Sequence, residues 1–148
     1  MRLNIGGYGL GEYGNYGGPD YGPVEVSYNE KTGEYYYTLG AGPKDGLDEV
    51  YMNHDIAYGL TELKLQRGDI TETEARLEIM AADRQLIKDS LAYNPFLDQR
   101  CENEAYAEAF KSAAITAFTG KMAYDMAQLV KAGVSDVIAE GAALMQDI

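Results

Sequence analysis

His54 is the only histidine in the chain, so any catalysis that depends on an imidazole must use it. A lone histidine on a helix is more often structural than catalytic, but its neighbours favour a chemical role. Asp55 follows it directly, and Tyr58 lies one helical turn further along the chain. A glycine loop at residues 40–42 closely precedes this segment and offers backbone carbonyls. Asp55 and such a loop together suit Ca²⁺, which takes about six to eight oxygen ligands.

Asp83 is the second residue whose surroundings indicate chemistry. Its same-face neighbours on a helix are all apolar: Ile79, Met80, Leu86 and Ile87. We therefore expect the Asp83 carboxylate to point into the core, where an unpaired charge costs several kcal/mol and needs a partner. A lysine or a tyrosine could be that partner in a purely structural role.

The turn between two predicted helices indicates which partner Asp83 meets. His54 and Asp83 lie at nearly equal distances along the chain before and after Gly68. If two helices fold antiparallel about this glycine, with a rise of about 1.5 Å per residue, both side chains reach nearly the same height. We predict that His54 and Asp83 meet, and that Tyr58 donates a hydrogen bond to the same carboxylate.

A His–Asp pair without a neighbouring nucleophile indicates a base that activates water, rather than an enzyme that forms an acyl intermediate. The sequence has no Gly-X-Ser-X-Gly motif to supply a serine nucleophile. One histidine and one cysteine, Cys101, cannot form a zinc site from histidine and cysteine ligands.

The elements that must position these residues follow from hydrophobic periodicity and turn residues. Two β-prone runs within residues 24–39 predict a small hairpin. Asp45 is a suitable cap for the helix that carries His54, and Asp69–Glu72 offers a capping box for the next helix. A third helical region, rich in alanine, is predicted to begin near Asn103 and to break at Gly120 or Gly133.

Composition divides the chain into three segments. Residues 1–22 are rich in glycine and tyrosine and are predicted to be a flexible or partner-ordered arm, because glycine carries a high ordering entropy. Residues 23–95 carry the hairpin and the candidate site, and residues 96–148 form Ala-rich helices of the same domain or an oligomerisation or partner segment. The predicted fold is mainly α: an antiparallel helix hairpin that carries the site, preceded by a glycine loop and a small β-hairpin, with additional C-terminal helices.

The net charge of −12 argues against a nucleic-acid partner, and it disfavours anionic membranes unless a cation bridges the two surfaces. The first residues lack the apolar run of a signal peptide, and no stretch of about 18 apolar residues predicts a transmembrane helix. A single cysteine fits a reducing compartment, or a particle assembled inside a cell.

These motifs resemble the phospholipase A2 superfamily. The matching residues are the segment from Gly40 to Asp48, the His54-Asp-Ile-Ala-Tyr58 string and the Ala82-Asp83-Arg84 string. The spacing of Pro43, Asp45 and Asp48, and its distance from His54, are similar to those of the secreted enzymes. The loop sequence and the lack of disulfides look more like the phospholipase domain of parvovirus-type minor capsid proteins.

The resemblance implies a calcium-dependent carboxylic ester hydrolase that cuts the sn-2 ester of glycerophospholipids at a membrane surface, with residues 23–95 as its catalytic core. His54 would activate water, supported by Asp83 and Tyr58. The resemblance also implies that Ca²⁺ is held by Asp55 and by the carbonyls of Thr38, Gly40 and Gly42. It implies a virion or cytoplasmic location, and the C-terminal helices could bind a second copy or a particle partner.

Two other hypotheses remain open from the sequence. The Gly/Tyr-rich segment and the Ala-rich tail also suit a structural or assembly protein of a virus-like particle that kept a vestigial phospholipase fold. The same motifs also fit a lipolytic effector of bacterial or phage origin.

Overall fold

The computed structural model describes residues 12–18 and 21–146 of the 148-residue chain. In this part of the chain, the prediction of a mainly helical fold with a small antiparallel sheet is confirmed. The helices are α1 (Gly46–Gln66), α2 (Glu72–Ala92), α3 (Glu104–Ala132) and α4 (Ser135–Met145). Strands β1 (Val24–Asn29) and β2 (Glu34–Leu39) form the sheet, and a 3₁₀ turn, η2 (Pro95–Leu97), follows α2.

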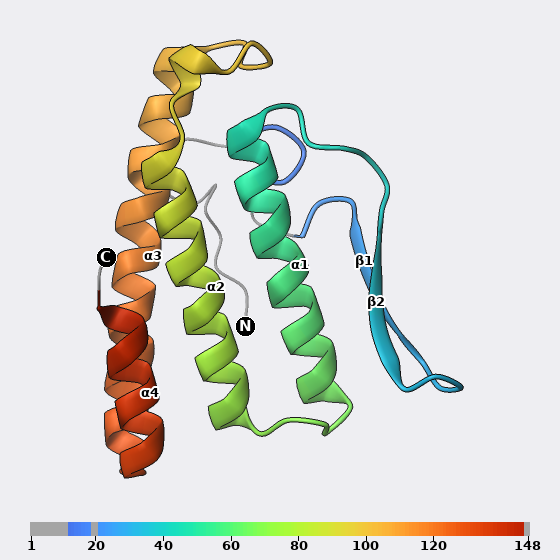
Figure 1. Cartoon of the computed structure of the whole chain (residues 1–148), viewed down its shortest axis with the longest axis vertical. Helices are drawn as coiled ribbons and strands as arrows, with labels where there is room; N and C mark the ends of the chain where they lie inside the picture. The colour runs from blue at the N-terminus through green and yellow to red at the C-terminus, as the bar shows by residue number, and fades with distance from the viewer. Residues whose placement is uncertain (1–11, 19–20, 147–148) are drawn as a thin grey trace.

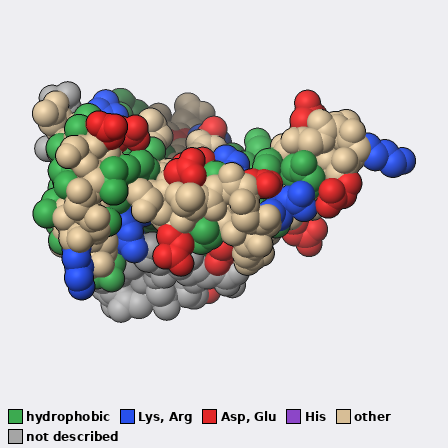
Figure 2. Space-filling view, turned by 90° about the horizontal axis from the view of Figure 1, so that it is seen from below, with side chains coloured by type: hydrophobic (Ala, Val, Ile, Leu, Met, Phe, Trp, Pro, Cys, Tyr) green, Lys and Arg blue, Asp and Glu red, His purple; other side chains and the backbone are tan. Residues whose placement is uncertain are grey.

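The first three helices lie side by side, with α2 between α1 and α3 (Figure 1). α4 packs against α2 and α3, and the β-hairpin packs against α1 through β1. Gly59 of α1 allows this approach, because a Cβ atom there would lie only 3.0 Å from Cγ1 of Val26. The hairpin stands out beyond the helices, with acidic and basic side chains on its surface (Figure 2). Residues 23–95 and the C-terminal helices therefore share packed surfaces.

Side-chain caps begin both of the helices that carry the candidate site, α1 and α2. Asp45 caps α1 by accepting a hydrogen bond from the Asp48 amide at 2.8 Å, as predicted. The capping box of α2 is formed by Thr71 and Glu74, so the sequence-based choice of Asp69 was wrong by two residues. Asp69 is engaged elsewhere, because it accepts hydrogen bonds from Tyr35 and Arg67.

The third helical region was predicted to break at either of two glycines, and only one of them ends α3. α3 continues through Gly120 and ends at Gly133, whose φ of 78° is the left-handed conformation that terminates a helix at low cost. α3 packs against α2, and Asp125 is fully buried among the apolar residues of α3. Its carboxylate accepts a hydrogen bond from Arg76 at 2.6 Å and another from Lys121. None of the helices in the described part of the chain is both long and apolar enough to cross a membrane.

The described part of the Gly/Tyr-rich segment packs on the core, which differs from the prediction of an arm. Tyr13 and Tyr16 are both buried in the core cluster. Two backbone amides of this segment, those of Asn15 and Tyr16, donate to the Asp48 carboxylate at 3.0 and 2.8 Å. The buried tyrosines and these hydrogen bonds offset the ordering entropy of the glycines. Residues 1–11 and 19–20 of the predicted arm lie outside the described residues.

The capping assignment of α2 predicts the effect of one substitution. We expect Thr71→Ala to lower the free energy of unfolding by about 1 kcal/mol, because it removes the side-chain acceptor for the Glu74 amide. Thr73→Ala is the matched control, since it makes the same chemical change inside the first turn of α2 and should alter stability far less. Urea unfolding followed by circular dichroism measures both. Equal losses in the two variants would contradict the assignment of Thr71 as the cap.

Candidate functional site

The structure brings His54, Asp83 and Tyr58 together between α1 and α2. His54 and Tyr58 lie four residues apart on α1 and so share a face, and Asp83 projects from the facing side of α2. Nε2 of His54 lies 2.7 Å from Oδ1 of Asp83, and the Tyr58 hydroxyl donates to the same oxygen. Asp83 is fully buried and His54 is 5% exposed. The carboxylate is therefore bound on one oxygen by two side chains from the neighbouring helix.

Two aromatic rings hold the imidazole in this orientation. The Tyr58 ring centroid lies 4.1 Å from that of His54, and the Phe118 ring of α3 meets the imidazole edge-on at 4.5 Å. Phe118 was missed by sequence reasoning, because nothing in the pattern of α3 indicates which of its aromatic residues faces the histidine. With Nε2 directed at Asp83, the second ring nitrogen, Nδ1, is the one left to take a proton from water.

Burial controls the protonation of the groups around the imidazole. Burial raises the pKa of Asp83, and the hydrogen bonds from His54 and Tyr58 act in the opposite direction. Burial and the neighbouring Asp83 charge raise the pKa of Tyr58 far above its ordinary value. Tyr58 therefore stays protonated and remains a hydrogen-bond donor to Asp83 at any physiological pH.

A small pocket of about 80 Å³ lies beside the imidazole, between α1 and α2. Its lining combines four apolar with four polar side chains: Val50, Asn53, His54, Ala57, Ala82, Gln85, Leu86 and Asp89. The lining contains no serine or cysteine. Among the lining side chains, His54 and Asp89 are the two titratable groups that a molecule in this pocket would meet.

The residues predicted to bind calcium differ in their exposure to solvent. Asp55 is buried on α1, whereas Thr38, Gly40 and Gly42 are exposed. The Tyr16 hydroxyl donates to the Ala41 carbonyl of the glycine loop. Burial raises the pKa of Tyr16, and the charges of Asp48 and Asp55 raise it further. Tyr16 thus holds one carbonyl of the glycine loop.

The donor set that these residues offer fits a hard cation. One carboxylate and several backbone carbonyls are the oxygen ligands that Ca²⁺ prefers, and the set contains no nitrogen or sulfur that would favour a softer metal. Among the described residues, no group of three or more His, Cys, Asp or Glu side chains is placed to hold a metal ion. A cation here would therefore depend on backbone carbonyls and on the position of the glycine loop.

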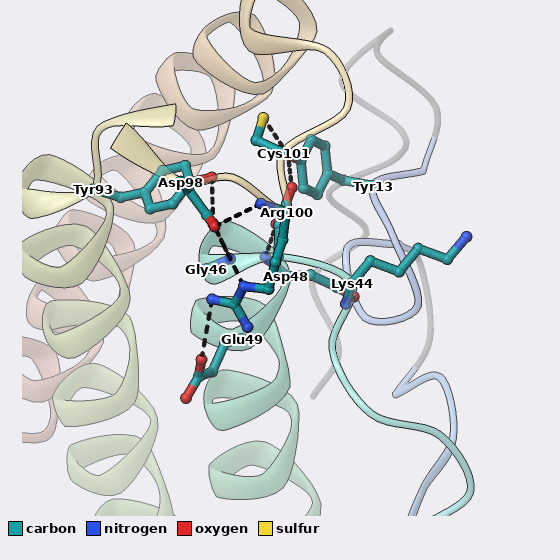
Figure 3. A network of polar contacts seen from close by, with 10 residues as sticks. Tyr13, Lys44, Gly46, Asp48, Glu49, Tyr93, Asp98, Arg100 and Cys101 are labelled. Atoms are coloured by element: carbon teal, nitrogen blue, oxygen red, sulfur yellow. Dashed lines mark hydrogen bonds and ion pairs between the residues drawn. The ribbon is translucent and has the colours of Figure 1, made fainter. Parts of the chain in front are cut away.

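A network of polar contacts lies around the start of α1 (Figure 3). Asp98 accepts hydrogen bonds from the Gly46 amide at 2.7 Å and from the Tyr93 hydroxyl at 3.0 Å. Although burial acts to raise its pKa, these bonds and those from Arg100 lower the pKa of Asp98 to about 2. The network joins the chain around residue 98 to the helix that carries His54.

Comparison of the chain with models of protein families, with curated proteins and with solved structures gave no match.

The orientation of the imidazole predicts which of its nitrogens carries the proton. We expect the neutral form of His54 to carry it on Nε2, because the Asp83 carboxylate accepts a hydrogen bond there. Long-range ¹H–¹⁵N correlation spectra distinguish the two tautomers, and a single histidine makes the assignment unambiguous. Asp83→Asn should weaken the preference, since an amide is a poorer acceptor than a carboxylate. A wild-type spectrum dominated by the Nδ1–H tautomer would contradict the proposed orientation.

Proposed function

We propose that the chain is a calcium-dependent hydrolase that cuts the sn-2 ester of glycerophospholipids, with His54 as the base that activates water. The observation that carries this proposal is the buried contact of His54 Nε2 with Asp83 at 2.7 Å, with Tyr58 donating to the same carboxylate oxygen. The resemblance of these motifs to phospholipase A2 supplies the substrate class.

The arrangement supports a general-base mechanism. Nδ1 of His54 takes a proton from a water molecule while the water oxygen attacks the ester carbonyl. Asp83 stabilises the imidazolium that forms, and the imidazolium then returns the proton to the departing alkoxide of the lysophospholipid. A positioned base of this kind accelerates a reaction by roughly 10²–10⁴-fold.

The surroundings of the imidazole favour water as the nucleophile. The described side chains that contact or line the space beside His54 include no serine, threonine or cysteine. Tyr58 is held as a donor to Asp83 by its raised pKa and is a poor nucleophile. Direct attack by water is therefore the simplest route, and no acyl-enzyme intermediate is needed.

Asp55 and the carbonyls of Thr38, Gly40 and Gly42 would hold the calcium ion. When bound, Ca²⁺ polarises the ester carbonyl and stabilises the oxyanion that develops on it. Because the set contains a single carboxylate, we expect modest affinity for calcium rather than the tight binding of buffer proteins.

A pair of substitutions separates the base from the metal ligand. His54→Gln should lower the rate of ester hydrolysis by about 10²–10⁴-fold while calcium binding persists, because the imidazole is not a ligand. Asp55→Lys should abolish both calcium binding and calcium-dependent activity, because it places an ammonium group where the ion would lie. Fatty-acid release from mixed micelles and calcium titration calorimetry measure the two effects.

Asp136→Lys is the matched control for Asp55→Lys, since it makes the same charge reversal at an exposed position on α4. It should leave both activity and calcium binding unchanged, and circular dichroism should show equal helix content in all variants. Loss of calcium binding in His54→Gln together with its retention in Asp55→Lys would reverse the assigned roles.

A further inference from the structure

The Gly/Tyr-rich segment that precedes the β-hairpin is anchored to α1 by one buried carboxylate. Asp48 is fully buried and accepts hydrogen bonds from three backbone amides: Asn15 at 3.0 Å, Tyr16 at 2.8 Å and Lys44 at 2.8 Å. Two of these amides belong to the segment, and the third belongs to Lys44, two residues after the glycine loop. Asp48 therefore fixes the segment and the loop relative to the helix that carries Asp55.

The backbone of the segment is shaped for this anchor. Gly14 has a φ of 56°, and a Cβ atom there would lie 2.4 Å from Cγ of Asp48, so only glycine fits. Tyr13 adds a second attachment, since its hydroxyl donates to the Asp45 carboxylate at 2.5 Å. Figure 3 shows Tyr13, Lys44 and Asp48 gathered around the first turn of α1.

Two side chains reach from this anchored segment to the glycine loop. Nδ2 of Asn15 donates to the Gly42 carbonyl at 2.8 Å, and the Tyr16 hydroxyl donates to the Ala41 carbonyl. Tyr16 is only 1% exposed, although the loop residues that it contacts are exposed. The carbonyls of Ala41 and Gly42 thus both accept hydrogen bonds from the anchored segment.

These contacts matter for a site made largely of carbonyls. A glycine loop loses much conformational entropy when it is fixed, and a cation that had to order the loop itself would bind more weakly. A carbonyl oxygen has two lone pairs, so the hydrogen bond from Asn15 leaves one lone pair of the Gly42 carbonyl for a cation. The hydrogen bonds that hold the loop therefore lower the entropic cost of binding a cation, and they leave the Gly42 carbonyl able to coordinate it.

We propose that the segment Tyr13–Gly17 is a strut for the calcium loop, and that Tyr16 and Asn15 are positioning residues that set its affinity for calcium. This inference rests on the proposed function, because it assumes that the loop and Asp55 hold the ion. It gives the Gly/Tyr-rich segment a role that composition alone did not reveal.

The test measures calcium affinity in the full chain by calorimetry and by competition with a fluorescent chelator. Tyr16→Phe and Asn15→Ala each remove one hydrogen bond to the loop, and each should weaken calcium binding by about 2–10-fold, the equivalent of one net hydrogen bond. The calcium concentration for half-maximal hydrolysis should rise by the same factor, while the rate at saturating calcium recovers. That recovery separates a positioning role from a catalytic one.

Tyr35→Phe is the matched control, because it removes a tyrosine hydroxyl that donates to the Asp69 carboxylate, outside the strut and away from its contacts with the loop. It should leave calcium affinity within about twofold of wild type on the same scale of one hydrogen bond. Asn15→Ala keeps the backbone bond to Asp48, so it tests the strut even if Tyr16→Phe folds poorly.

The outcomes separate the strut from the proposed function. If wild type binds no calcium, the proposed metal site fails and the strut fails with it. If wild type binds calcium but Asn15→Ala and Tyr16→Phe bind it equally well, the strut is overturned and the proposed function stands. Equal weakening by Tyr35→Phe and Tyr16→Phe would also overturn it, because the loss of calcium affinity would then not depend on the contacts of the strut with the loop.

Discussion

The Asp83 carboxylate has no access to solvent, and its hydrogen bonds to α1 constrain the rest of the site. An isolated buried carboxylate would cost several kcal/mol, so α1 must present partners at the height of Asp83 on α2. His54 and Tyr58 supply them at one oxygen. A slip of one helical turn, about 5.4 Å, would break both contacts and leave the charge unpaired. The buried charge of Asp83 therefore fixes the register of α1 against α2. It also fixes the orientation of the His54 imidazole.

The first turn of α1 is a second place where buried carboxylates organise the molecule. Asp45 and Asp48 lie at the positive end of the helix dipole, where negative charge is favourable, and each also binds a segment distant in sequence. Asp98 reaches the same turn from the chain between α2 and α3. α1 thus connects three features along its length: the attachment of the glycine loop at its start, and Asp55 and His54 further along. Three of the acidic residues that make the chain negatively charged, Asp45, Asp48 and Asp98, therefore hold segments of the chain against the start of α1.

The meeting of His54 and Asp83 could be predicted from sequence because it depends on local features. The apolar neighbours of Asp83 indicate its face, and the turn at Gly68 sets the relative height of the two helices. Phe118 and Tyr16 could not be predicted in the same way, since their contacts are fixed only when distant segments pack. For Tyr16 the composition was misleading, because glycine content reports the entropy cost and not the hydrogen bonds from Asp48 that offset it. The choice between Asp69 and Thr71 as the cap of α2 failed for a similar reason, since Tyr35 of the distant hairpin engages Asp69.

The most direct measurement of the central claim uses wild-type protein and a phosphatidylcholine that carries different acyl chains at its sn-1 and sn-2 positions. The lipid is presented in neutral mixed micelles, because the charge of −12 disfavours anionic surfaces, and the products are identified by mass spectrometry. A base that acts with Ca²⁺ on the sn-2 ester predicts release of the sn-2 fatty acid and the matching lysophospholipid with calcium, and none in excess chelator. Hydrolysis that persists at full rate in chelator, release of the sn-1 chain, or no release at saturating calcium would contradict the account.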